Sequence, residues 1–144
     1  PAFAERPVTV VTNAVNIATD LTVRPHVRVV VTGGVARARS YELVGPLAQL
    51  ILPQISVDTA FLGVQGLVAG ESLFADHEGE AQINAAFAES AQRLVVITDH
   101  SKLGVRLFAR IIETSRIDTL ITDSEADPRL LRPFEQAGIE VVLA

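Results

Sequence analysis

Cysteine is absent from the 144 residues, which excludes a disulfide framework, a thiolate nucleophile and a cysteine-ligated zinc site. No apolar run approaches the roughly 18 residues that a membrane-spanning helix needs. Positive charge is scarce, because 12 lysines and arginines stand against 17 aspartates and glutamates and leave a net charge of −5. A nucleic-acid-binding surface needs a basic surplus, so the composition argues against one.

Lysine is also rare, since Lys102 is the single lysine and every other basic residue is an arginine or histidine. Codon bias in a GC-rich genome explains such an excess of arginine over lysine. A specific need for a compact, strongly hydrated ammonium group at that position explains it too. Composition leaves both explanations open.

The length and the 49% hydrophobic content predict one domain over residues 1–144 with a real core. The first residues, PAFAERP, lack the charged and apolar regions of a signal peptide, so we expect a cytoplasmic protein. Because the chain starts with Pro1 rather than methionine, we also expect it to be part of a longer protein.

Short apolar runs alternate with helix-like patterns along the chain. We expect strands at 8–11, 27–31, 59–63, 94–98, 119–122 and 140–143. We expect helices at 16–22, 46–52, 78–93, 105–112 and 128–137, with a loop at 64–75. The strands are continuously apolar rather than alternating, which is typical of strands covered on both faces. The sequence therefore predicts an α/β fold with a mostly parallel sheet flanked by helices.

The residues that follow the expected strands are small, polar or glycine. In open parallel sheets, ligands bind beyond the carboxyl ends of the strands. We therefore expect these residues to gather at one edge of the sheet: Thr12-Asn13, Thr32-Gly33-Gly34, Val64-Gln65-Gly66, Thr98 to Lys102, and Thr122-Asp123.

Gly33-Gly34 is a place where backbone N–H groups could hold an anion, with Arg37 nearby as a fork for phosphate. A plain turn is the alternative. The dinucleotide pattern G-x-G-x-x-G and the Walker A pattern are both absent from the sequence. Thr12-Asn13 could contribute to the same site or cap the following helix.

The segment from Asp99 to Lys102 is the richest in chemistry. Asp99 could accept hydrogen bonds from sugar hydroxyls, and Lys102 could hold a phosphate or a carbonyl oxygen. The alternative is an aspartate or serine cap beside a surface lysine.

No metal site is expected. His26 and His100 are too isolated to suggest zinc, and Glu71 and Asp123 have no evident partner in the sequence. One further group of candidate ligands fits the acidic start of a helix better, because the helix dipole favours negative charge there. Its members are Asp76, His77, Glu78 and Glu80.

Read together, several segments resemble the C-terminal effector domain of the DeoR family of bacterial transcriptional repressors. The resemblance runs from Val8 to Thr122 and follows the order and spacing of the family. The matching segments are V-V-T-N (10–13), N-I-A (16–18), T-G-G-V-A-R (32–37), L-V-G-P-L-A (43–48), D-T-A-F-L-G-V-Q-G-L (58–67), E-A-Q-I (80–83), T-D-H-S-K-L-G (98–104) and I-D-T-L-I-T-D (117–123).

The resemblance implies a Rossmann-like fold similar to ribose-5-phosphate isomerase, glucosamine-6-phosphate deaminase and the coenzyme A transferases. It implies a sensor of phosphorylated sugars or related metabolites that needs no cofactor and acts on DNA through a winged helix-turn-helix absent from this chain. It also implies a homo-oligomer, either dimer or tetramer. The effector-binding residues it implies are Thr12, Asn13, Gly33, Gly34, Arg37, Asp99 and Lys102, with Gln65 and Asp76 as weaker candidates for specificity.

We expect two departures from the family because of where the chain begins. It lacks the DNA-binding module that family members carry upstream, which agrees with the acidic net charge, and it begins too late to contain the strand and the Gly-Thr-Thr loop that the family has just before the position of Val8. We therefore expect an exposed neighbouring strand, either 8–11 or 94–98, to be covered by another chain.

The main alternative function is a sugar-phosphate isomerase or deaminase of the same fold. Such an enzyme needs a base close to the reacting carbon. The loop after the third strand offers Gln65 and no carboxylate before Glu71, so the sequence favours binding without turnover. A purely structural dimerisation module is the third possibility.

Overall fold

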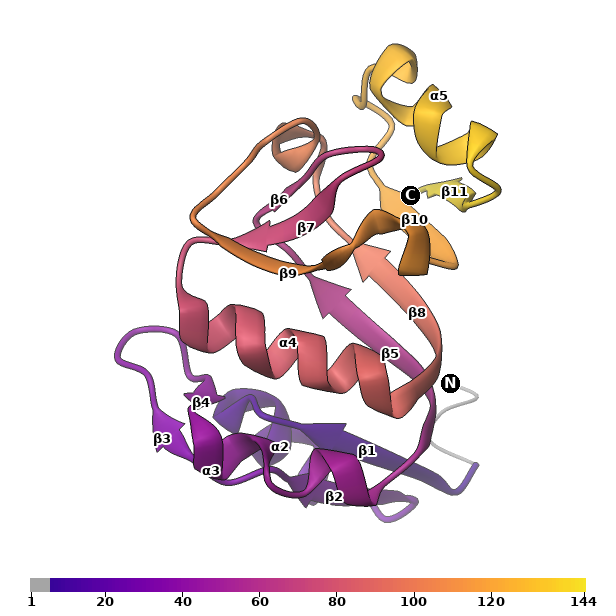
Figure 1. Cartoon of the computed structure of the whole chain (residues 1–144). Helices are drawn as coiled ribbons and strands as arrows, with labels where there is room; N and C mark the ends of the chain where they lie inside the picture. The colour runs from indigo at the N-terminus through magenta and orange to yellow at the C-terminus, as the bar shows by residue number, and fades with distance from the viewer. Residues whose placement is uncertain (1–5) are drawn as a thin grey trace. The chain divides into compact units, whose positions relative to one another are not determined.

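The computed structural model describes residues 6–144. The contacts within the chain form two compact units, one extending to Gln54 and the other starting at Ile55 (Figure 1). Each unit has its own strands and helices. A single domain over residues 1–144 stays a prediction.

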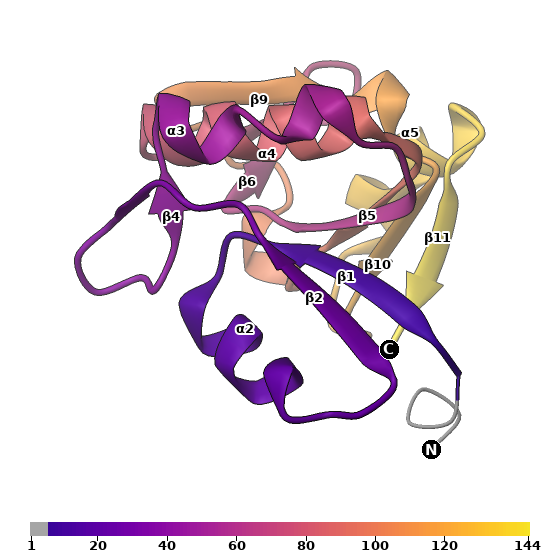
Figure 2. The same ribbon diagram turned by 90° about the horizontal axis from the view of Figure 1, so that it is seen from below.

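The first unit is built around two parallel strands and the helix that connects them. Strand β1 (Val8–Thr12) pairs with β2 (Val27–Val31) in a register that places Thr12 opposite Val31. Helix α2 (Val15–Thr22) connects them (Figure 2). Its residue Ala18 is buried. The expected strands and helix of this segment are confirmed, with both strand ends carried to the same edge.

The rest of the first unit is a short antiparallel pair followed by a short helix. The elements are β3 (Val35–Ala36), β4 (Leu43–Val44), α3 (Pro46–Gln49) and the 3₁₀ turn η1 (Leu52–Gln54). The helix expected over 46–52 was too long. Pro53 has no N–H to donate and disfavours helix at the residue before it, so the chain tightens into η1 instead.

The second unit contains a parallel sheet of four strands in the order β11-β10-β8-β5. The strands are β5 (Val57–Gly63), β8 (Ala91–Ile97), β10 (Thr119–Thr122) and β11 (Glu140–Leu143). Every pair is parallel, so the predicted α/β class with a mostly parallel sheet is confirmed. The carboxyl ends of β5, β8 and β10 consequently lie at one edge of the sheet.

Two helices pack against this sheet and complete its core. Helix α4 (Glu78–Ser90) lies against β5 and β8, and α5 (Pro128–Gln136) lies against β11 (Figure 1). Val96 and Leu120 are fully buried in the resulting core, and Ile83 of α4 is fully buried as well. The aspartate cap expected at the start of α5 is confirmed, because Asp127 accepts a hydrogen bond from the N–H of Arg129.

A small antiparallel sheet replaces two expected features of the second unit. It consists of β6 (Gly66–Leu67), β7 (Ser72–Ala75) and β9 (Ala109–Glu113), so the segment 64–75 is a hairpin rather than a loop. The helix expected over 105–112 was wrong. Ala109 and Ile111 are buried while Arg110 between them is exposed, which is the two-residue period of a strand.

Two further expectations about strands need correction. Helix α4 ends at Ser90 and β8 starts at Ala91, so residues 91–93, which we expected to be helical, extend the strand and pair with β5. The strand at 94–98 is not exposed at an edge, because β8 lies between β5 and β10; β5 ends the sheet order instead. Among residues 6–144, no helix is long and apolar enough to cross a membrane.

Candidate functional site

The ends of β1 and β2 bring two of the predicted turns together in the first unit. The N–H of Thr32 donates to the carbonyl oxygen of Thr12 at 3.1 Å, which continues the pairing of the strands by one residue. The Thr12 hydroxyl accepts a hydrogen bond from the N–H of Ala14 at 3.1 Å, and both threonines are buried. The chain therefore leaves each strand through a fixed, polar turn.

Asn13 joins the turn after β1 to strand β4. Its side-chain amide donates to the carbonyl oxygen of Leu43 at 3.0 Å, while the N–H of Leu43 donates to the carbonyl oxygen of Asn13 at 2.8 Å. The first residue of α2 is preceded by Ala14, and no side chain caps the helix. Helix capping by Thr12 or Asn13, one of the two functions considered for them, is wrong; both residues fix the turn instead.

Gly33 and Gly34 form a turn that only glycine adopts easily, with φ of +76° and +116°. A Cβ on Gly34 would lie 2.6 Å from the Cβ of Ala48 in α3, so packing also requires glycine there. Arg37 follows in the β3–β4 hairpin, where its N–H donates to the carbonyl oxygen of Glu42 at 2.8 Å. The structural requirement for these glycines is thus established, and phosphate binding by them stays a prediction.

In the second unit, the end of β8 leads into the 3₁₀ turn η2 (His100–Lys102). Thr98 anchors the start of this turn by donating its N–H to Ile121 at 3.0 Å and its hydroxyl to Val64 at 3.3 Å. Carbonyl oxygens of both adjacent chain segments therefore fix the position where the turn begins.

Asp99 organises the turn from within. Its carboxylate accepts hydrogen bonds from the N–H and the hydroxyl of Ser101, the first at 2.8 Å. The serine hydroxyl, then its N–H, and to a smaller degree the charge of Lys102 hold the pKa of Asp99 below its usual value. The Lys102 ammonium lies 3.8 Å from the same carboxylate, with 38% of its side chain exposed. Asp99 therefore caps the turn and at the same time places its charged carboxylate close to Lys102.

The backbone of η2 has no N–H group to spare. The N–H groups of His100 and Ser101 bind the carboxylates of Asp123 and Asp99. Those of Lys102 and the residue after it bind carbonyl oxygens within the turn, at 3.2 Å each. An anion at this turn would consequently bind side chains, above all the Lys102 ammonium, rather than the backbone.

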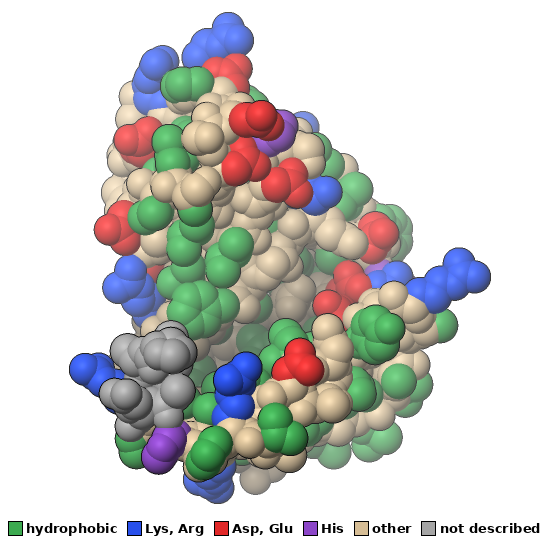
Figure 3. Space-filling view, turned by 180° about the vertical axis from the view of Figure 1, so that it is seen from behind, with side chains coloured by type: hydrophobic (Ala, Val, Ile, Leu, Met, Phe, Trp, Pro, Cys, Tyr) green, Lys and Arg blue, Asp and Glu red, His purple; other side chains and the backbone are tan. Residues whose placement is uncertain are grey.

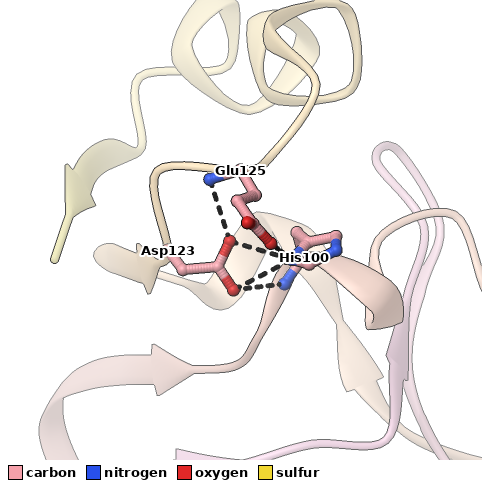
Figure 4. Close-up of side chains that lie close together, drawn as sticks. All are labelled: His100, Asp123 and Glu125. Atoms are coloured by element: carbon pink, nitrogen blue, oxygen red, sulfur yellow. Dashed lines mark hydrogen bonds and ion pairs between the residues drawn. The ribbon is translucent and has the colours of Figure 1, made fainter.

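His100 and Asp123 are neighbours, although no pattern in the sequence pairs them. The imidazole Nδ1 lies 2.9 and 3.0 Å from the two carboxylate oxygens of Asp123, and the N–H of His100 donates to the same carboxylate at 3.1 Å (Figure 4). Hydrogen bonding to Asp123 raises the pKa of His100, and the bonds from His100 lower the pKa of Asp123. Asp123 therefore has a partner, contrary to expectation.

Glu125 completes a charged group with this pair, its carboxylate lying 3.7 Å from Nδ1 of His100. In the space-filling view, acidic side chains gather around a histidine on the surface (Figure 3). The ligand-type atoms of the three residues lie within 4.8 Å of one another. Nδ1 already forms a hydrogen bond with Asp123, so a cation bound there would have to displace the proton of that hydrogen bond. The geometry is that of an ion pair, and we assign no metal to it.

The remaining candidates of the second unit form two separate pairs. The side-chain oxygen of Gln65 accepts a hydrogen bond from the N–H of Asp76 at 2.9 Å, which joins the two residues predicted to influence specificity. Glu71, expected to lack a partner, forms a two-pronged ion pair with Arg106, and this hydrogen bond lowers the pKa of Glu71. Glu78 and Glu80 lie in the first turn of α4, which confirms the expected acidic helix start, and His77 caps the helix by accepting a hydrogen bond from the N–H of Gly79.

The structure thus groups the predicted residues within each unit. Thr12, Asn13 and the Gly33-Gly34 turn share the edge where β1 and β2 end, and Asp99 and Lys102 share η2. His100 and Asp123 were missed as a pair. The adjacency of β8 and β10 would have revealed them, because residues just beyond adjacent parallel strands lie side by side.

The class defined by these observations is an α/β domain with polar and glycine-containing turns at the ends of parallel strands. A family profile described as DeoR C terminal sensor domain matches residues 2–124. The chain belongs to this family, as its sequence motifs suggested.

Relatives with curated names support the same family. The chain is 32% identical over 136 residues to the HTH-type transcriptional regulator GolR of Listeria innocua, covering 94% of this chain and 54% of that protein. It is 35% identical to the HTH-type transcriptional regulator GlpR of Haloferax volcanii, covering 92% and 51%. It is 28% identical to the glycerol-3-phosphate regulon repressor of Escherichia coli K12, covering 93% and 53%. The chain therefore spans about half the length of these relatives.

Proposed function

We propose that this chain is the effector-sensing part of a DeoR-type transcriptional repressor, acting in the cytoplasm on DNA. It binds a phosphorylated sugar or a related phosphorylated metabolite. Binding changes the DNA affinity of a winged helix-turn-helix that lies outside this chain. The observation that carries the proposal is the η2 turn, which presents the single lysine of the chain on a backbone fixed by two carboxylates.

Each candidate residue has a distinct part in this proposal. The turn of Gly33 and Gly34, together with Arg37, binds the phosphate through backbone N–H groups and a guanidinium. Asp99 accepts hydrogen bonds from sugar hydroxyls, and Lys102 binds a phosphate oxygen or the open-chain carbonyl. The smaller contributions come from Thr12 and Asn13 beside the phosphate, and from Gln65 and Asp76 in choosing the sugar.

Binding without turnover is the second part of the proposal. An isomerase or deaminase needs a base near the reacting carbon. Gln65 is an amide, and its oxygen is already engaged by Asp76. The pKa of Glu71 is lowered by its bond to Arg106, which makes this carboxylate a weaker base. The relatives reported above are named as transcriptional regulators, which agrees with a sensor.

A thermal-shift panel tests the proposal. Glycerol 3-phosphate, fructose 1-phosphate, glucose 6-phosphate and ribose 5-phosphate are added separately at millimolar concentration, and at least one is expected to raise the melting temperature. A ligand at about 100 times its dissociation constant adds roughly 2.7 kcal/mol of stability. No shift with any phosphorylated sugar would contradict sensing and favour a structural dimerisation module. Rapid conversion of the sugar phosphate would favour an enzyme.

Lys102→Ala identifies the site. Loss of a charged hydrogen bond of about 1.5–3 kcal/mol weakens binding about tenfold to a hundredfold, as measured by calorimetry. Arg116→Ala is the control, because it also removes one positive charge, from a surface pair with Glu89. Arg116 lies before β10, at the edge of the sheet away from η2. Unchanged affinity in Lys102→Ala would show that the site lies elsewhere.

We also propose that the protein assembles as a dimer or tetramer. Repressors that bind two-fold operators are symmetric, because each half-site contacts one copy. Light scattering of the protein with and without the effective sugar phosphate measures the assembly, and a monomer under both conditions would contradict it.

A further inference from the structure

We infer that His100 and Asp123 position Lys102: the Asp123 carboxylate ties the η2 turn to the end of β10, and effector affinity depends on this pair although neither residue touches the effector. The inference rests on the proposed function, because it concerns the same turn. It assigns a task to two residues that the binding scheme leaves unused.

The contacts of Asp123 are those of a positioning group. Its carboxylate receives hydrogen bonds from the backbone and the imidazole of His100, and from the N–H of Glu125 at 3.1 Å. The bonds from His100 link the turn after β8 to the turn after β10, in addition to the pairing of the two strands and the ion pair of His100 with Glu125. Asp123 is thus a common anchor for both turns.

The position of His100 within the turn explains why the anchor matters. His100 lies between Asp99 and Lys102, and the N–H of Lys102 binds the carbonyl oxygen of Asp99. A shift of His100 therefore moves both proposed ligand-binding side chains. A lysine side chain loses considerable rotational entropy on binding, so a fixed backbone beneath it lowers the entropic cost of reaching the phosphate.

A positive charge on the His100 imidazole strengthens its bond to the Asp123 carboxylate. The groups that face the imidazole are the carboxylates of Asp123, Glu125 and Asp99, all of which favour its protonated form. The raised pKa of His100 means that the charged pair is complete below about pH 6.5 and is lost as the pH rises through the higher folded-state value. The side chains of His100 and Asp123 are 42% and 35% exposed, so salt weakens the attraction.

Two substitutions of His100 separate positioning from simple structural disruption. His100→Ala removes the imidazole donor and should weaken binding of the most effective sugar phosphate of the panel about tenfold. His100→Asn keeps an N–H donor close to the place of Nδ1 but cannot be charged, so its affinity at pH 8 should stay within about twofold of the unmodified protein. His26→Ala is the control, because His26 is a histidine of the other unit, and this substitution should leave the affinity for the sugar phosphate unchanged.

The pH profile gives the second measurement. The ratio of the affinities of the unmodified protein and His100→Asn should favour the unmodified protein at pH 6 and approach one at pH 8–9. Taking the ratio cancels the ionisation of the phosphate itself, which has a pKa near 6. A ratio independent of pH would overturn the contribution of the charged pair.

Amide hydrogen exchange tests the inference without any effector. Exchange of residues 100–103 should become faster in His100→Ala and stay close to the unmodified rate in His100→Asn. Unchanged exchange and affinity in His100→Ala would overturn the inference while the sensor function stands. If no sugar phosphate binds the unmodified protein, the proposed function fails, and unchanged exchange in His100→Ala would overturn positioning separately.

Discussion

Single residues in this fold are constrained by the backbone that surrounds them, and Gly66 is the sharpest case. A Cβ added there would lie 2.4 Å from the carbonyl oxygen of Val105, a distance at which the backbone has to move. At Gly63, three residues earlier, the nearest atom to an added Cβ is the carbonyl oxygen of Ile97 at 4.0 Å. The two glycines therefore lie close together in the sequence, but the space around the backbone requires a glycine at Gly66 and leaves room for a Cβ at Gly63.

Gly66→Ala should lower the free energy of unfolding by about 1–3 kcal/mol, the typical cost of overpacking. Gly63→Ala should leave it unchanged or raise it by up to about 1 kcal/mol, because alanine has less conformational freedom to lose in a strand. Urea unfolding of the two variants measures the difference. Equal stability of both would contradict the close contact with Val105.

The candidate site illustrates what single residues reveal in the sequence. Lys102 stood out because it is the one lysine, and Asp99 because it follows an apolar run. His100 and Asp123 did not, since their separation of 23 positions in the sequence conceals a contact that depends on two strands being adjacent. Candidate residues within one turn could be predicted from the sequence, whereas an interaction between two turns could not.

At the scale of elements, α4 depends on a small number of apolar positions. Ile83 is fully buried, while Gln82 beside it is exposed. Ile83→Ala should therefore destabilise the protein by about 2–5 kcal/mol, because the substitution leaves a cavity. Gln82→Ala on the same helix should change stability by no more than about 0.5 kcal/mol. Thermal unfolding compares them, and a small loss in Ile83→Ala would mean that the core collapses around the gap.

Elements fixed by local signals were predicted well. Helix α5 has a capping aspartate, a proline in its first turn and Gly138 with φ of +88° after its end, and its bounds agree closely with expectation. Strand β9 was mistaken for a helix because its short apolar pattern fits both periods. Pairing with β7 decides in favour of the strand, and that partner is more than 30 residues away.

At the scale of the whole molecule, the two units differ in how much apolar surface they bury. Among residues 6–54 of the first unit, the buried hydrophobic side chains are Ala18, Ala48 and Leu52, whereas the second unit holds an extensive core cluster. Regions with few buried apolar contacts open locally at lower free energy. The first unit is consequently expected to be the less stable of the two.

Amide hydrogen exchange should show this difference directly. The amides of β1 and β2 should exchange faster than those of β8 and β10, where the sheet is packed against the core. Leu120→Ala removes a fully buried side chain from β10 and should speed exchange in the second unit more than in the first. Uniform protection of both units would indicate that they unfold together as one cooperative domain.

The sequence by itself determined the α/β class, the strands with their polar ends, the caps of α5 and membership of the DeoR sensor family, because these depend on local pattern and motif order. Tertiary structure decided the order of the strands, the pairing of β9 with β7 and the pairing of His100 with Asp123. Each of these joins residues far apart along the chain, and a hydrogen bond between distant segments leaves no periodicity in either segment.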